Sequence, residues 1–376
     1  MPTPVVDAFG LHHPLLPAGA LPLLALRDRC ECATCSHPSG QRLLDPAALS
    51  TDLTATVVSG DEQQVTVRWE PEGHLSTYSL AALTAPQEVP AQVHLWAADA
   101  AAQLPVAAHA MVAGADRAGR EALLHWLRGV AAMGCGVLTG VPIADGEVAR
   151  VAELFGFVRH TNYGRWFDVR TQVDPTNLAN TSLGLPPHTD NPYRDPVPTL
   201  QLLHCHQSST AGGSNVLVDG WRIAAELRAA DPDGFAQLAR RAVTFAYHDE
   251  TVALSATAPL IELAPDGQVR ALRSNHRSLQ QLPLPTSDKE VRDLEVWYRA
   301  YTRFARMVAD PSFHLHVQLR PGDLFIVDNR RVLHGRTAYD AGGGSRHLQG
   351  CYADIDGLHS TISVLERSLV SADGSP

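Results

Sequence analysis

The sequence predicts a mainly β protein of the α+β class, with a jelly-roll barrel that carries helical insertions and a small β-rich domain before it. Three observations support this prediction. Strand-like runs joined by turns fill the second half of the chain, a helical pattern precedes them, and a separate strand-turn-strand pattern lies near the N-terminus. Because 376 residues exceed what one core usually supports, we expect one large domain and one smaller one.

The small domain is predicted from two short strands. Residues 65–69 have the pattern of a strand, residues 70–73 with their Pro and Gly form a turn, and a second run extends through Tyr78. A segment rich in Ala and Pro follows and carries the domain boundary. We therefore expect an N-terminal arm over residues 1–21 and the small domain over residues 22–95.

The large domain is expected over residues 96–370 and begins with a helix. Its leucines recur at helical spacing, for example at Leu123 and Leu127, and a Gly-Cys-Gly sequence then ends the helix at Gly134. The strands expected after it cover residues 137–139, 199–205, 215–219, 314–319 and 323–327.

Two further expectations concern the end of the chain. The strands at 314–319 and 323–327 are expected to pair with each other across the Arg-Pro-Gly turn between them. Residues 371–376 are small and polar, so we expect a disordered tail.

Composition argues against two classes of partner. The apolar fraction of 45% and charged fraction of 19% are those of a globular protein, while a net charge of -10 and a pI near 5.9 provide no basic field for nucleic acid or an anionic membrane. Residues 1–19 lack the basic and apolar regions of a signal peptide. No apolar run approaches the roughly 18 residues of a spanning helix. We therefore expect a cytoplasmic protein that binds neither nucleic acid nor membrane.

Three residues are candidates for a metal centre: His188, Asp190 and His334. Residues two apart on an extended segment point the same way, so His-x-Asp can offer both side chains to one metal. Two imidazoles and one carboxylate on one face of iron leave open positions that can hold a bidentate keto acid and dioxygen together. The pair alone is weak evidence. With 18 histidines and 40 acidic residues, chance gives roughly two His-x-acid pairs, and His188 by itself fits a surface histidine or a hydrogen-bonded one better than a metal ligand.

A cationic residue, Arg346, lies downstream of this triad. In a strand over residues 346–352, every second side chain faces the same way, so Arg346 and Tyr352 share one face. A guanidinium matches a carboxylate in bidentate geometry. Arg346 is therefore a candidate to bind the distal carboxylate of a keto acid, and the alternative is a surface ion pair.

Longer motifs surround these residues. His-Thr-Asp at 188–190 is followed by Gln-Leu-Leu-His-Cys at 201–205, and Pro-Gly-Asp at 321–323 precedes Asp-Asn-Arg-Arg-Val-Leu-His-Gly-Arg at 328–336. Together with the Arg346 segment, they resemble the gamma-butyrobetaine hydroxylase branch of the taurine dioxygenase superfamily over nearly the whole chain. The resemblance implies a double-stranded β-helix, Fe(II) and 2-oxoglutarate as cofactors with O2, and a homodimer. It implies that iron binds His188, Asp190 and His334, and that 2-oxoglutarate binds Arg346.

A second metal site is predicted near the N-terminus. Cys30, Cys32 and Cys35 place three thiols within six residues, and His74 follows downstream. Three thiolates and one imidazole complete a tetrahedral zinc shell with no position open for catalysis. The arrangement is similar to the N-terminal domain of the butyrobetaine hydroxylases. This similarity favours a structural zinc over three unliganded reduced cysteines.

The resemblance also implies where the substrate binds. Tyr163, Phe167 and Tyr352 match residues of an aromatic cage that attracts a quaternary ammonium through the ring quadrupole. Asn177 and Asn275 match polar residues that hold the anionic end of the substrate. The alternative for Tyr163 and Phe167 is that they pack in the core.

Two positions depart from the pattern of the family. Asn180 stands where a cage tyrosine is usual, and Asn191 follows the His-Thr-Asp triplet where an aromatic residue is common. Fewer rings and two added amides are expected to weaken trimethylammonium binding and to favour a group that forms hydrogen bonds. A related betaine, an amino acid or a natural-product intermediate fits this description.

The sequence therefore predicts a dioxygenase that hydroxylates an unactivated C–H of a small polar molecule containing an amine or betaine, with release of succinate and CO2. Desaturation, cyclisation, or C–N or C–C cleavage remain open as alternative outcomes of the same site. A non-catalytic binding protein would require a broken triad, and a zinc hydrolase would consume no 2-oxoglutarate.

Overall fold

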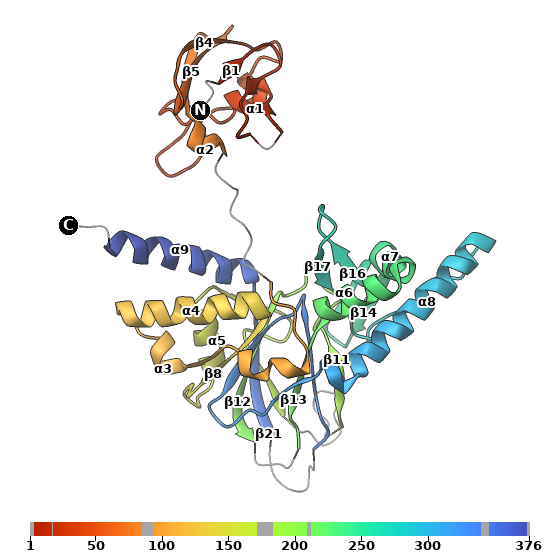
Figure 1. Cartoon of the computed structure of the whole chain (residues 1–376). Coiled ribbons are helices and arrows are strands. Elements are labelled where there is room, and N and C mark those ends of the chain that lie inside the picture. The colour runs from red at the N-terminus through yellow and green to blue at the C-terminus, as the bar shows by residue number, and fades with distance from the viewer. Residues whose placement is uncertain are drawn as a thin grey trace. The chain divides into compact units, whose positions relative to one another are not determined.

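The computed structural model of the chain describes residues 4–16, 18–84, 93–170, 183–208, 212–339 and 346–373. The chain forms two compact units, Met1–Pro90 and Ala91–Pro376. Figure 1 labels their helices and strands.

The N-terminal unit is built around an antiparallel three-stranded meander. Its strands are β4 (Thr54–Gly60), β5 (Gln64–Glu70) and β6 (His74–Ser79). Alternate side chains of β5, ending in Trp69, point into a core that they share with Tyr78. The remaining elements are β1 (Val5–Val6), β2 (Leu11–His12), β3 (Ala20–Leu21), α1 (Leu23–Arg27) and α2 (Leu80–Thr84).

The segment expected to be an N-terminal arm is integrated into this unit. Strands β1, β2 and β3 form a small antiparallel sheet within it. Leu11 and Leu16 are buried in the same core as Trp69. A unit this small needs the additional apolar surface, and strands of two residues are too short for the sequence pattern to reveal.

The large unit contains two sheets that enclose a common core, which confirms the predicted double-stranded β-helix. Leu203 of the larger sheet and Leu217 of the smaller sheet meet in this core. The larger sheet has the order β10 (Phe167–Arg170), β21 (Arg346–Ala353), β12 (Leu200–Ser208), β19 (Leu324–Asp328), β8 (Cys135–Thr139), β7 (Val106–Ala108), with β9 (Val158–Arg159) beside β21. The smaller sheet has the order β11 (Leu185–His188), β20 (Val332–Arg336), β13 (Asn215–Asp219), β18 (Leu315–Val317).

Helices cover the outer face of the larger sheet. Because side chains alternate along a strand, Leu202 of β12 faces the helices whereas Leu203 faces the other sheet. The covering helices are α4 (Arg117–Met133) and α9 (Ile355–Asp373), with the shorter α3 (His109–Val112) and α5 (Glu147–Ala152) nearby (Figure 1). As predicted, α4 ends at Gly134, which adopts a left-handed conformation with φ of 74°.

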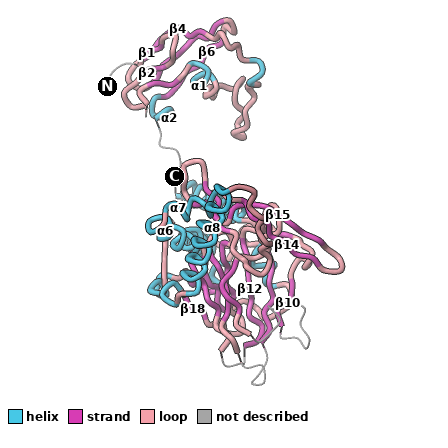
Figure 2. The backbone as a smooth tube through the Cα atoms, turned by 90° about the vertical axis from the view of Figure 1, so that its right-hand side faces the viewer, coloured by secondary structure: helices cyan, strands magenta, loops and turns pink. Residues whose placement is uncertain are grey.

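An insertion between β13 and β18 covers the smaller sheet. Val218 and Leu333 of that sheet share a core with Phe235 and Trp297 of the insertion. Figure 2 shows α6, α7 and α8 gathered beside the sheets, with the hairpin of β14 and β15 extending from them. The elements are α6 (Gly220–Ala230), α7 (Pro232–Arg240), β14 (Ala242–His248), β15 (Ala253–Pro259), β16 (Ile261–Leu263), β17 (Val269–Leu272) and α8 (Asp288–Ala309).

The predicted pairing of the strands around the Arg-Pro-Gly turn is wrong. Both strands exist, but β18 pairs with β13 in the smaller sheet and β19 pairs with β12 and β8 in the larger sheet. The turn therefore carries the chain from one sheet to the other, as strands of a jelly roll do. At the C-terminus, α9 extends to Asp373, within the segment expected to be disordered, and residues 374–376 lie outside the described residues.

A buried ion pair joins the start of β20 to the rest of the large unit. Arg331 Nη2 lies 2.7 Å from Asp219 Oδ2, and both side chains are almost completely buried. Arg331 also donates hydrogen bonds to the carbonyls of Ala132 and His94. Asp219 accepts two backbone N–H groups at the start of α6. This pair therefore fixes the strand that carries His334.

We expect Arg331→Leu to lower the free energy of unfolding of the large unit by about 3–5 kcal/mol, because it leaves a buried carboxylate without its cation. The matched control is Arg128→Leu, which removes an exposed pair with Glu366 and should cost less than about 1 kcal/mol. Urea unfolding followed by tryptophan fluorescence measures both. Equal losses would contradict the structural role of the buried pair.

Candidate active site

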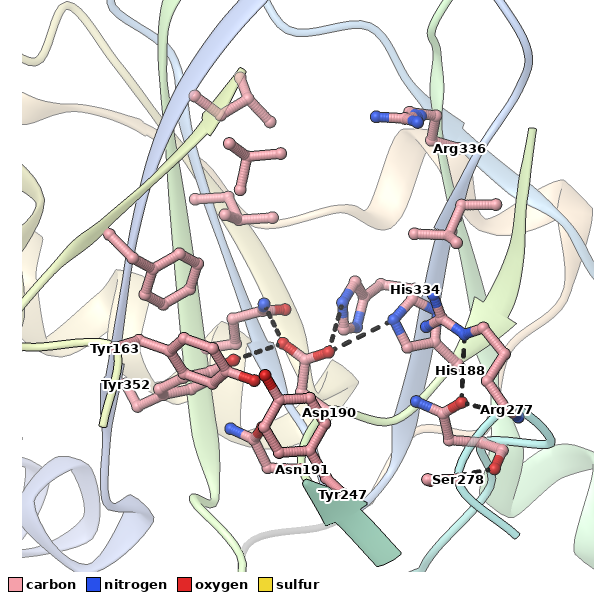
Figure 3. A pocket seen from close by; sticks show the side chains of 18 of the residues that line it. Tyr163, His188, Asp190, Asn191, Tyr247, Arg277, Ser278, His334, Arg336 and Tyr352 are labelled. Atoms are coloured by element: carbon pink, nitrogen blue, oxygen red, sulfur yellow. Dashed lines mark hydrogen bonds and ion pairs between the residues drawn. The ribbon is translucent and has the colours of Figure 1, made fainter. Parts of the chain in front are cut away.

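The strands β11 and β20 bring two histidines together. In their antiparallel register, His188 lies opposite His334, and the ring centroids are 4.7 Å apart. Asp190 follows β11, and its Oδ1 lies 3.3 Å from Nε2 of His188 and 3.7 Å from Nε2 of His334. Figure 3 shows the three side chains converging. The structure thus brings the predicted triad together.

Asn329, in the turn between β19 and β20, fixes the loop that carries Asp190. Its Oδ1 accepts a hydrogen bond from the Asp190 N–H (2.7 Å), and its Nδ2 donates to the carbonyls of Asp190 (3.0 Å) and Pro198 (2.8 Å). On the other side, the Thr189 N–H donates to the carbonyl of Ser274 (2.8 Å). The backbone at Asp190 is therefore held from both directions.

The protonation states of the triad suit a divalent cation. Burial alone would raise the pKa of the Asp190 carboxyl, but the neighbouring imidazoles of His334 and His188 and the hydrogen bond from Tyr352 hold this pKa well below its usual range. Burial lowers the pKa of His334 to about 3, against the opposing charge of Asp190. His188 Nδ1 lies 3.0 Å from the carbonyl of Pro186, so that nitrogen carries the proton and Nε2 presents a lone pair. The site therefore offers one carboxylate oxygen and the Nε2 atoms of two imidazoles that face it.

The spacing of the triad also fits a metal ion. Bonds of about 2.1 Å that meet at a right angle place neighbouring ligand atoms about 3.0 Å apart. The observed separations of 3.3 and 3.7 Å are slightly wider, so small movements close the three side chains on an ion. Two imidazoles and a carboxylate on one face are the donor set of non-haem iron with open positions.

The triad lines a cavity of about 420 Å³, and Arg346 lines it from β21 on the same strand face as Tyr352, as predicted. Arg346 is buried, and among the described residues no carboxylate pairs with it; its Nη2 lies 3.5 Å from Asn215 Oδ1. Burial and the nearby charge of Arg336 lower the pKa of Arg346 to about 10. A buried guanidinium without an anion is costly. The distal carboxylate of 2-oxoglutarate fits this position.

Five aromatic rings, here called the ring cluster, line the cavity. Phe167 on β10 packs against Tyr163 and Tyr352, with centroids 5.9 and 5.3 Å away. Tyr247 on β14 packs against Tyr163 at 6.4 Å and stacks on Tyr193 at 5.1 Å. Sequence reasoning identified the first three rings but missed Tyr193 and Tyr247. No local sequence pattern marks these two residues, because Tyr193 reaches the cavity from a loop and Tyr247 reaches it from the insertion.

Of the four asparagines that the sequence assigns to the substrate site, two line the cavity and two lie outside the described residues. Asn275 lines the cavity, and so does Asn191. Asn191 has φ of 52°, a left-handed conformation that Asn tolerates better than most residues, and its Oδ1 accepts a hydrogen bond from Tyr193. Asn177 and Asn180 lie outside the described residues.

Arg277 is a cavity residue that sequence reasoning also missed. Its Nε donates to Asn275 Oδ1 at 3.3 Å, and no carboxylate within the described part of the chain pairs with it. In Figure 3, Tyr163 and Tyr352 lie on one side of Asp190, whereas Arg277 lies on the opposite side with the two histidines. The cavity therefore has an aromatic end and a cationic end.

In the N-terminal unit, the structure brings the four predicted zinc ligands together. His74 Nε2, at the start of β6, lies 3.4, 3.6 and 3.7 Å from the sulfur atoms of Cys30, Cys32 and Cys35. Tetrahedral zinc with ordinary bond lengths places sulfur and nitrogen about 3.6 Å apart. Arg27 donates a hydrogen bond to Cys35 Sγ at 3.3 Å. The four side chains therefore fit a closed zinc site.

A jelly roll with this triad and a buried arginine defines a class of protein, the non-haem iron oxygenases that use a keto acid. Residues 105–352 match the taurine catabolism dioxygenase TauD, TfdA family, and residues 17–84 match the N-terminal domain of gamma-butyrobetaine hydroxylase-like proteins. The chain belongs to the TauD/TfdA family and is a dioxygenase that uses Fe(II) and 2-oxoglutarate.

Relatives align over almost the whole chain. A gamma-butyrobetaine dioxygenase from Pseudomonas sp. (strain AK-1) is 35% identical, covering 92% of this chain and 90% of that protein. The gamma-butyrobetaine dioxygenase of Homo sapiens is 30% identical, covering 92% and 91%. A trimethyllysine dioxygenase from Meyerozyma guilliermondii is 26% identical, covering 90% and 89%. Within the described residues, every helix is too short or too polar to cross a bilayer.

We expect His74→Ala and Cys32→Ser to remove zinc from the N-terminal unit and to lower its thermal midpoint, because structural zinc supplies much of the folding free energy of such small units. The control is His37→Ala, an exposed neighbour that bonds Ser39. Zinc content by mass spectrometry and thermal unfolding by circular dichroism measure the effect. Full zinc content in both ligand variants would contradict this site.

Proposed function

We propose that this dioxygenase hydroxylates a small zwitterion that has a methylated ammonium at one end and a carboxylate at the other. The observation that carries the proposal is the polarity of the cavity. Tyr163 and Tyr352 of the ring cluster lie on one side of Asp190, and Arg277 lies on the other side with the two histidines (Figure 3). Asn275 accepts a hydrogen bond from Arg277. The names of the relatives, gamma-butyrobetaine and trimethyllysine dioxygenases, denote substrates with both groups.

The ring cluster presents aromatic faces to a cation, while its hydroxyl protons are engaged with other partners. All four of its phenol oxygens already have partners: Tyr163 and Tyr193 bond each other, Tyr193 also bonds Asn191, Tyr247 bonds Asp249, and Tyr352 bonds Asp190. Tyr193 and Tyr247 also restore the ring surface that Asn191 does not provide. A methylated cation therefore meets aromatic faces, which attract it through the ring quadrupole.

The residues of the chain position the reactants. Bound iron and 2-oxoglutarate supply the oxidation, in which O2 gives one oxygen atom to the substrate C–H and one to succinate while CO2 is released. Arg346 holds the distal carboxylate of 2-oxoglutarate, and the triad holds the ion. With the ammonium on the ring cluster and the carboxylate at Arg277, the carbon chain between them lies over the triad. A C–H between the two charged ends is therefore the one presented for hydroxylation.

We further propose that the N-terminal unit binds zinc, that the enzyme is a homodimer, and that it works in the cytoplasm. All six cysteines are free thiols, three of them in the predicted zinc site. Such a cluster suits a reducing compartment. The homodimer rests on the family resemblance, and light scattering of the purified enzyme tests it.

The function is tested by succinate formation with four matched probes. Gamma-butyrobetaine carries both charged ends, 4-aminobutanoate has a primary amine, 5,5-dimethylhexanoate lacks the positive charge, and 4-(trimethylammonio)butanamide lacks the carboxylate. We expect gamma-butyrobetaine to have the highest kcat/KM, with losses of about 10-fold or more for each other probe, because each lacks one charged or methylated contact. Equal rates of succinate formation with all four probes, or no rate above that without substrate, would contradict the proposal.

The same probes test Arg277. Arg277→Gln should raise KM for gamma-butyrobetaine by about 10-fold to 100-fold, as loss of a hydrogen bond between charged groups does, and should leave KM for the butanamide unchanged. Arg165→Gln is the control, since Arg165 pairs with Glu153 on the surface. If Arg277→Gln raises KM equally for gamma-butyrobetaine and the butanamide, Arg277 does not bind the carboxylate.

A further inference from the structure

The two carboxylate oxygens of Asp190 have different surroundings. Oδ1 faces the two histidine nitrogens, at 3.3 and 3.7 Å. Oδ2 faces away from them and accepts two hydrogen bonds, one from the Tyr352 hydroxyl at 2.8 Å and one from Gln201 Nε2. Dashed lines in Figure 3 mark these interactions around Asp190. One oxygen is thus available to an ion, and the other is occupied by protein donors.

The larger sheet supplies both donors at one position. Gln201 on β12 and Tyr352 on β21 are directly opposite each other in the antiparallel register. Both side chains are buried, with 3% and 4% of their surface exposed. Asp190 is held against them by its backbone bonds to Asn329. The arrangement therefore joins the larger sheet, through Oδ2, to a metal site whose histidines come from the smaller sheet.

We propose that Gln201 and Tyr352 are positioning residues that keep Asp190 a one-oxygen ligand of the iron. A carboxylate that binds through both oxygens occupies two coordination positions. Iron held by two imidazoles and one carboxylate oxygen keeps three positions open, two for the keto acid and one for dioxygen. Two donors on Oδ2 oppose its rotation toward the ion, and they fix the direction of Oδ1, as hydrogen bonds to metal ligands generally do.

Tyr352 has a second role in this arrangement. Its ring belongs to the ring cluster, 5.3 Å from Phe167, while its hydroxyl holds Asp190. A substrate cation that packs against this ring therefore contacts a side chain bonded directly to an iron ligand. Tyr163 makes a useful contrast, because its ring is also in the cluster but its hydroxyl bonds Tyr193.

The inference rests on the proposed iron ligands, and its test is a binding measurement that needs no turnover. Mn(II) is the probe, because it prefers oxygen and nitrogen ligands to the thiolates of the N-terminal unit. The full chain is stripped of metal, resupplied with one equivalent of zinc for the Cys3His site, and titrated with Mn(II) by electron paramagnetic resonance. Thermal unfolding of each zinc-resupplied variant before Mn(II) is added reports any purely structural effect.

We expect Tyr352→Phe and Gln201→Met each to raise the Kd for Mn(II) by about 10-fold, within the range seen when a hydrogen bond to a metal ligand is lost. Each has a matched control that should leave the Kd unchanged. Tyr163→Phe removes a phenol from the same cluster. Gln349→Met changes a buried glutamine of β21 that bonds the Gly146 N–H instead.

The variant His188→Ala distinguishes the positioning role of Gln201 and Tyr352 from the proposed set of iron ligands. If His188→Ala loses Mn(II) while Tyr352→Phe and Gln201→Met bind it as tightly as the unmodified protein, the positioning role is overturned and the ligand set stands. If His188→Ala binds Mn(II) normally, both are overturned. Weaker binding in the two variants with unchanged thermal midpoints supports the inference.

Discussion

The active site depends on the register between β11 and β20. This pairing places His188 opposite His334, and a shift by one residue would turn one imidazole out of the cavity. Other interactions maintain it. The buried Arg331–Asp219 pair holds the start of β20, and Asn329 in the preceding turn brings the backbone of Asp190 toward the two imidazoles. The edge of the smaller sheet and the turn that connects β19 to β20 thus determine where an ion can bind.

The cavity is organised by charges that lack partners in the protein. Arg346 is buried without a carboxylate among the described residues, and Arg277 bonds only the neutral Asn275 within the same part of the chain. A buried cation such as Arg346 favours an anionic ligand, because a bound carboxylate replaces the hydration that burial removes. Arg277 is exposed and lines the same cavity, so it attracts an anion through its charge alone. The ring cluster has no comparable charge and instead offers aromatic faces. A dicarboxylate cosubstrate and a zwitterionic substrate together satisfy these sites.

Much of this site follows from the sequence, because its central residues lie in short motifs with fixed chemistry. The His-x-Asp pair, the later histidine and Arg346 line one cavity of the large unit, as expected. Within the N-terminal unit, the four Cys3His residues come together as a separate group. Spacing cannot show which sheet a strand joins, so the pairing of β18 and β19 was wrong. Tyr193, Tyr247 and Arg277 also went unrecognised. They reach the cavity from a loop and an insertion, and only the tertiary packing of α6 to α8 and β14 to β17 places them there.

The most direct test of the central claim is an anaerobic titration of the Fe(II)-loaded protein with 2-oxoglutarate, followed by visible absorption. A keto acid chelated to iron in open positions gives a charge-transfer band. The structure predicts such a band for the unmodified protein, its loss in His334→Ala, and a higher Kd for 2-oxoglutarate in Arg346→Met. Absence of the band in the unmodified protein, or an unchanged band in His334→Ala, would contradict an iron site at His188, Asp190 and His334.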